Sequence, residues 1–149
     1  MHPVNESALD TRYRIILILW FALFSSIAML FLLAILITPG ENVSENMVMS
    51  LTFVSLGTLS VIASYFVKQR FLAQAVAKQD VALVQTGTIV AAALCEVAAM
   101  LALIDLFMTG NQYYYLLMIV AIIGTLLNFP RRDHLLAASY QNPESEVMG

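Results

Sequence analysis

Residues 86–105 read TGTIVAAALCEVAAMLALID, and this stretch decides the class of fold. It is predominantly apolar, with one carboxylate inside it, Glu96, and a second at its end, Asp105. A helix needs about 20 predominantly apolar residues to cross the hydrocarbon core of a bilayer. An ionisable side chain at that depth costs roughly 2.5–3.5 kcal/mol on insertion scales, so it is usually kept where it faces another helix or a water-filled path. We therefore interpret the stretch as a membrane span and Glu96 as its candidate functional residue.

The rest of the chain has the same character. Its 149 residues are 60% hydrophobic and only 11% charged, with a mean hydropathy of +0.83, whereas a soluble domain carries about 25% charged residues. The apolar residues gather in four blocks, each close to or above the length of a span. We therefore predict an all-α, polytopic membrane protein, a bundle of four transmembrane helices within 15–129. The predicted spans are residues 15–37, 47–67, 81–107 and 113–129.

The basic residues predict the orientation of these spans. They precede the first span, lie between the second and third, or follow the fourth, and the other two connections contain none. The seven are Arg12, Arg14, Lys68, Arg70, Lys78, Arg131 and Arg132. Because basic residues favour the cytoplasmic side, we predict that residues 1–14 and the tail 130–149 are both cytoplasmic. We expect a multi-pass protein of the plasma membrane, the inner membrane of a bacterium.

The connections between the spans carry helix signals of their own. From Phe71 onward, apolar residues recur at i, i+1, i+4 and i+5, which predicts that the second helix continues for a turn or two beyond the membrane. Asp80 precedes the third apolar block and is the expected N-cap of the third helix. Pro130 follows the fourth block and is expected to end that helix.

Small residues line one face of the third span at helical spacings of three and four. They are Gly87, Ala91, Cys95, Ala98, Ala99 and Ala102. Small side chains let helix backbones approach closely, which drives helix association in lipid. Glu96 borders this stripe, so we expect its carboxyl between helices, with Ser55, Thr58 or Ser60 of the second span as a hydrogen-bond partner. Asp105 lies about 180° around the same helix, where we expect a hydrated residue near the outer interface.

The sequence lacks the residue sets that catalytic and metal sites require. Cys95 is the only cysteine, so the chain forms no internal disulfide and no cysteine-based zinc site. We find no nucleophile–base pair and no phosphate-binding glycine loop. The net charge of −3 argues against a nucleic-acid partner. We therefore expect no enzymatic activity, no metal and no cofactor, and as partners the lipid bilayer together with other membrane subunits or further copies of the chain.

A family resemblance lies in two adjoining segments. Residues 75–80 read AVAKQD, a polar loop, and residues 88–103 read TIVAAALCEVAAMLAL. Together, over about residues 68–107, they resemble the helical hairpin of the ATP synthase subunit c proteolipids (F/V-type). In that family a cytoplasmic loop precedes a helix whose carboxylate binds the translocated proton. The resemblance implies that Glu96 is the ion-binding carboxylate.

Two classes of function stay open at this point. In the first, the chain is a non-catalytic subunit or assembly partner of a membrane complex, which packs through its third span. In the second, it is a proteolipid that moves protons or other ions by reversible protonation of Glu96. Glu96 could also serve only as a neutral, hydrogen-bonded carboxyl between helices, at about 0.6 kcal/mol per such bond. A conventional carrier is disfavoured because the four spans show no internal repeat.

Overall fold

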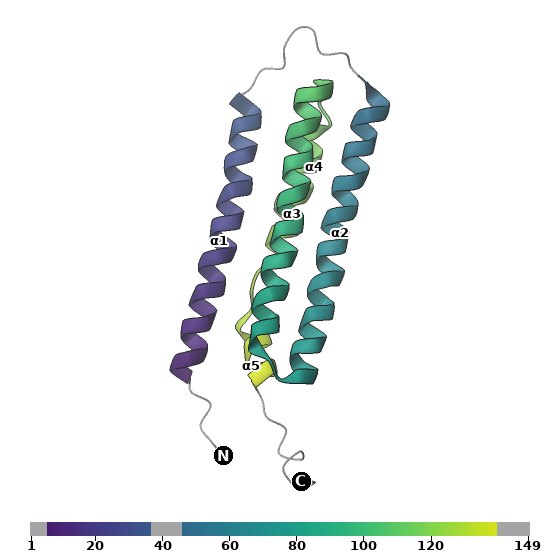
Figure 1. Cartoon of the computed structure of the whole chain (residues 1–149). Helices are drawn as coiled ribbons and strands as arrows, with labels where there is room; N and C mark the ends of the chain where they lie inside the picture. Colours follow the sequence, from purple (N-terminus) through teal and green to yellow (C-terminus); the bar gives the residue numbers. More distant parts are fainter. Residues whose placement is uncertain (1–5, 37–45, 140–149) are drawn as a thin grey trace.

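The computed structural model describes residues 6–36 and 46–139. Every regular element in these ranges is an α-helix, which confirms the all-α class (Figure 1). The helices are α1 (Glu6–Leu36), α2 (Met47–Lys78), α3 (Val81–Thr109), α4 (Tyr114–Leu127) and α5 (Arg132–Ser139).

Three of these helices, α1, α2 and α3, are each long and apolar enough to cross a bilayer. The fourth helix, α4, has 14 residues and is therefore only about 21 Å long. It meets the length of a span only together with α5, after a bend of 44°. The described helices thus give three candidate spans, or four if the bent pair is counted as one.

The helix boundaries agree with the sequence in several places. Helix α2 starts at Met47 and continues to Lys78, so its predicted extension beyond the span is confirmed. Helix α4 ends at Leu127, ahead of Pro130 as expected. The short helix α5 lies inside the predicted tail and was not anticipated. Residues 37–45 and 140–149, which include the end of the first predicted span and the end of that tail, lie outside the described ranges.

The connection between α2 and α3 is a tight turn. Gln79 adopts the left-handed conformation with φ of 51°, and the backbone N–H of Asp80 donates to the carbonyl of Ala75 at 3.0 Å, which closes the end of α2 as a Schellman motif. The Asp80 Oδ1 then accepts from the N–H of Ala82 at 2.9 Å. Asp80 is therefore the N-cap of α3, as predicted.

Helix α3 lies at the centre of the bundle. It contacts each of the other helices, whereas α1 and α2 make no contact with each other within the described residues. Figure 1 shows α1 and α2 on opposite sides of α3, with α4 behind it. The start of α1, the turn between α2 and α3, and α5 all lie at one end of the bundle.

The inward side of α3 carries a buried seam in which the spacing alternates strictly between four and three residues. The seam consists of Val84, Thr88, Ala91, Cys95, Ala98, Ala102, Asp105 and Thr109. A repeat of 3.5 residues keeps one face against a neighbouring helix and is typical of left-handed helix packing. On α2 the small buried residues Ser50, Gly57 and Ser64 recur every seven residues. The two patterns together account for the close pairing of α2 with α3.

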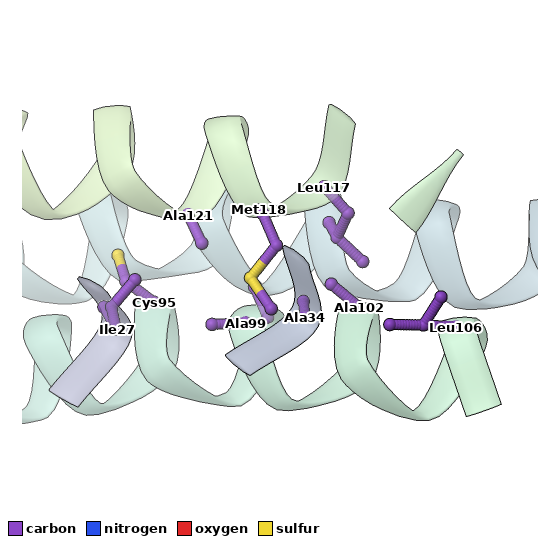
Figure 2. Packing of buried hydrophobic residues seen from close by; sticks show 10 residues of the cluster. Ile27, Ala34, Cys95, Ala99, Ala102, Leu106, Leu117, Met118 and Ala121 are labelled. Atoms are coloured by element: carbon purple, nitrogen blue, oxygen red, sulfur yellow. The ribbon is translucent and has the colours of Figure 1, made fainter. Parts of the chain in front are cut away.

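The main apolar cluster fills the space between α3 and α4. Figure 2 shows Met118 and Ala121 of α4 beside Ala99 of α3, with Ile27 of α1 in the same cluster. A glycine permits this packing, because a Cβ on Gly57 would lie 2.6 Å from Leu117 Cδ1. Helix α1 is joined to α4 by a hydrogen bond in which Trp20 Nε1 donates to the carbonyl of Thr125 at 3.1 Å.

Candidate functional site

Glu96 lies half-buried where α3 meets α1. The hydroxyl of Ser26, on α1, donates to Glu96 Oε1 at 2.5 Å. The expected partner from the second span is therefore wrong. Ser60 of that span instead donates to the carbonyl of Leu94 at 2.9 Å. The physical reason is the helical phase, because Glu96 follows the buried Cys95 by about 100° and so faces α1 on the side away from α2.

An uncovered face of α3 runs beside Glu96. It consists of Ala93, Val97, Met100 and Ile104, spaced by four, three and four residues, all of them exposed. Val97 is 46% exposed and Met100 51%. Helices α1 and α2 do not contact each other within the described residues, and the exposure of these four side chains shows that neither helix covers this face. The Glu96 carboxyl therefore lies at the edge of an apolar surface that residues 6–36 and 46–139 leave open.

The small-residue stripe is buried inside the chain. Gly87, Ala91, Cys95, Ala98 and Ala102 are all buried, the last four of them completely. A Cβ on Gly87 would lie 2.5 Å from Cβ of Phe71, on α2. The stripe thus serves helix packing, as its composition indicates, but its partners are α2 and α4 of the same chain. The surface expected to receive another subunit is already occupied.

The second carboxylate of α3 is enclosed. Asp105 is 0% exposed, and it accepts hydrogen bonds from Ser50 at 2.8 Å and from Thr109 at 2.9 Å. The expectation of a hydrated boundary residue is therefore wrong. Asp105 belongs to the buried seam of α3, so its side chain faces the start of α2 instead of the headgroup layer.

A polar cluster that the sequence reasoning missed lies about midway along α2 and α3, where the end of α4 meets them. Asn128 Nδ2 donates to Ser64 Oγ at 3.0 Å and lies 3.7 Å from Cys95 Sγ. Lys68, predicted to lie on the cytoplasmic side between the second and third spans, is only 6% exposed, and its Nζ donates to the carbonyl of Phe129 at 3.2 Å. The available signal was Asn128 itself, a polar residue at the end of the fourth apolar block.

Basic side chains gather around this cluster. Burial lowers the pKa of His134, on α5, below its ordinary value, and the positive charges of Lys68 and Arg131 lower it further, whereas Asp133 acts in the opposite direction.

A salt bridge of 2.6 Å between Arg132 and Asp10 links α5 to the first part of α1. Both of its side chains are about half exposed, and such pairs add little stability.

No protein-family model matches this chain, and no curated protein or solved structure is similar enough to count as a relative. The resemblance to the subunit c hairpin therefore stays a prediction, and the site is interpreted from its own geometry.

Proposed function

We propose that this chain is a non-catalytic subunit or assembly partner of a complex in a bacterial inner membrane. The observation that carries the proposal is the uncovered face of α3, with the Glu96 carboxyl at its edge. A carboxylate is expensive to expose to lipid, and within the described residues Ser26 is the one side chain that donates a hydrogen bond to it. A helix of another subunit, or of a second copy, would cover the face and supply a further donor.

The shape of this face suits helix docking. Hydrocarbon provides no hydrophobic drive for helices to associate, so contact depends on close packing and polar bonds. Ala93 offers a place where a partner backbone can approach, and Glu96 offers a polar bond beside it. The docking surface proposed here is therefore the uncovered face of α3, in place of the small-residue stripe on its opposite side.

The test compares two exposed alanines on different helices. Ala93→Leu, on the uncovered face, should hold a partner helix away and reduce its co-purification severalfold, as should Glu96→Ala. Ala28→Leu adds the same volume to an exposed position on α1 and should leave co-purification unchanged. The proposal would be contradicted if Ala93→Leu and Ala28→Leu co-purified with equal amounts of the partner subunit or of a second copy of the chain.

A second candidate function is proton or ion translocation through Glu96. It is favoured by the position of the carboxyl, which is only half-buried and is held by a serine hydroxyl without a basic partner among the described residues. Ser26 holds this carboxyl in one orientation at the edge of the uncovered face of α3. The resemblance to the subunit c hairpin points to the same residue.

Glu96→Gln separates the two candidates, because glutamine keeps hydrogen-bonding groups at this position and removes the titratable proton. If Glu96 carries ions, proton flux in proteoliposomes should disappear in this variant while the complex stays assembled. If flux is the same in the variant and the wild type, translocation through Glu96 is excluded and the subunit proposal stands.

We further propose that the chain crosses the membrane four times, with both ends in the cytoplasm. Two observations support this topology. The start of α1, the turn between α2 and α3, and α5 lie at the same end of the bundle. All seven basic residues precede the first predicted span, lie between the second and third, or follow the fourth. A four-span topology puts these three segments on one side, and basic residues favour the cytoplasmic side.

A further inference from the structure

A groove between α2 and α4 opens on the outside of the bundle. Its volume is about 240 Å³, and Val61, Ile62, Phe66 and Leu127 form apolar walls. Three of these side chains are exposed, by 49% for Ile62, 63% for Phe66 and 72% for Leu127. The groove is larger than a 150 Å³ apolar cavity that binds benzene. It is therefore large enough to hold part of an alkyl chain.

Two polar residues, Ser64 and Asn128, also line this groove. Asn128 is 1% exposed, and its Nδ2 donates a hydrogen bond to Ser64 Oγ. Its Oδ1 has no hydrogen-bond donor among the described residues. A buried carbonyl without a donor is uncommon in folded proteins. The groove thus adjoins a buried acceptor whose donor is missing from the described chain, which indicates a ligand whose polar end carries a hydrogen-bond donor, such as a headgroup hydroxyl.

Positive charge lies directly beside that polar group. Lys68 Nζ contacts the carbonyl of Phe129, the residue after Asn128, and an ammonium has three N–H donors to place. Arg131 follows two residues later and is exposed. Neither side chain pairs with a carboxylate within the described residues, where the one salt bridge joins Arg132 to Asp10. Neither Lys68 nor Arg131 lines the groove itself, but Lys68 follows the lining residue Ser64 by one helical turn, so the positive charge adjoining the groove is complementary to an anion.

We propose that the α2–α4 groove binds an anionic phospholipid, with one acyl chain between Ile62 and Leu127 and the phosphate beside Lys68 and Arg131. Basic pockets between membrane helices on the cytoplasmic side are suited to anionic headgroups, and the predicted orientation puts these residues on that side. An acyl chain fits the narrow apolar walls, whereas a helix would need a wider contact. This site is formed by α2 and α4, whereas Glu96 lies where α3 meets α1, and it does not depend on the proposed function.

The experiment measures lipid retention by the purified full-length chain in native mass spectrometry. Phosphatidylglycerol and phosphatidylcholine with identical acyl chains are supplied at equal concentration. The wild type should retain one phosphatidylglycerol in preference to phosphatidylcholine. Lys68→Gln should lower that preference about fivefold, the effect of one basic residue near an anionic surface, and Lys68→Arg should restore it. Arg131→Gln changes an exposed side chain and tests the charge without altering the interior.

A matched pair of variants tests the groove itself. Ile62→Trp fills it and should abolish retention of the lipid. Ile18→Trp makes the same change at an exposed position on α1 and should behave as the wild type. Equal retention of both lipids by the wild type, or unchanged retention by Ile62→Trp, would overturn the proposal. So would displacement of the lipid by inorganic phosphate, which would indicate a site for the headgroup alone, or a protein helix found in the groove instead.

Discussion

Asp105 and Glu96 lie on the same helix, α3, in different surroundings. Asp105 is enclosed and accepts from two hydroxyl groups, those of Ser50 and Thr109. Glu96 has a single hydroxyl, that of Ser26, and is only half-buried. The hydrogen-bond donors to the Asp105 carboxyl thus come from its own chain, which suits a structural role. The carboxyl of Glu96 keeps room for another partner, which is why the proposed functions use it.

The role of Asp105 can be tested through its donor on α2. Ser50→Ala removes one of the two hydroxyl groups and leaves a buried carboxyl oxygen without that partner. We expect a loss of about 0.6–1.7 kcal/mol in the free energy of unfolding, the range found for hydrogen bonds between membrane helices. Unfolding in mixed micelles with increasing sodium dodecyl sulfate measures it.

Ser55→Ala is the control for this prediction, because Ser55 is exposed on the same helix. It should change the free energy of unfolding by less than about 0.5 kcal/mol. If the two variants are equally stable, the contact between Ser50 and Asp105 does not contribute to the stability of the bundle.

At the level of the helix, α3 presents two apolar sides with different uses. Its buried seam contacts α2 and α4, and small residues such as Ala91 and Ala98 bring the backbones together. Its uncovered face, which includes Val97 and Met100, meets no helix of the chain within the described residues. One side of α3 therefore holds the bundle together, and the other is available to the surroundings.

This division predicts where added volume is harmful. Ala91→Leu enlarges a side chain that is 0% exposed, so the helices must separate or distort to accept it. We expect a loss of about 1–3 kcal/mol in the free energy of unfolding, as for other overpacked interiors. Ala28→Leu, at an exposed position of α1, should be tolerated, and a similar loss in both variants would show that burial in the seam is not the cause. The same unfolding assay applies.

Much of this arrangement follows from the sequence, and some of it does not. Composition and block length gave the helices, and Asp80 was identified as a cap because its chemistry is local. The sequence does not predict which helices pack against each other, since α3 is apolar on nearly every side and hydrophobic periodicity therefore does not distinguish its faces. The donor to Glu96 depends on α1 lying opposite α2, an arrangement of the whole bundle. The enclosure of Asp105 depends on the same arrangement.

For the whole molecule, the proposed topology can be tested with single introduced cysteines. Gln79→Cys, in the turn between α2 and α3, should react with a membrane-impermeant maleimide only after the membrane is opened. Gln112→Cys, between α3 and α4, should react in intact cells, because the positive-inside preference puts it outside. Both positions are exposed.

The native Cys95 serves as an internal control, because it is buried and should stay unlabelled in the folded protein. Labelling of Gln79→Cys in intact cells, or protection of Gln112→Cys in them, would contradict the topology in which both ends are cytoplasmic.

The absence of contact between α1 and α2 has a consequence for biosynthesis. Helix α1 leaves the ribosome first, but every helix it packs on, α3, α4 or α5, is made after α2. Its polar groups, the hydroxyl of Ser26 and the indole N–H of Trp20, gain their partners only when Glu96 and Thr125 have been synthesised. Until then α1 has no described helix to pack on, while α2 and α3 can pair as soon as their turn is complete. Docking of α1 therefore belongs to a late step of assembly, and a nascent chain that ends after α2 lacks every helix on which α1 packs.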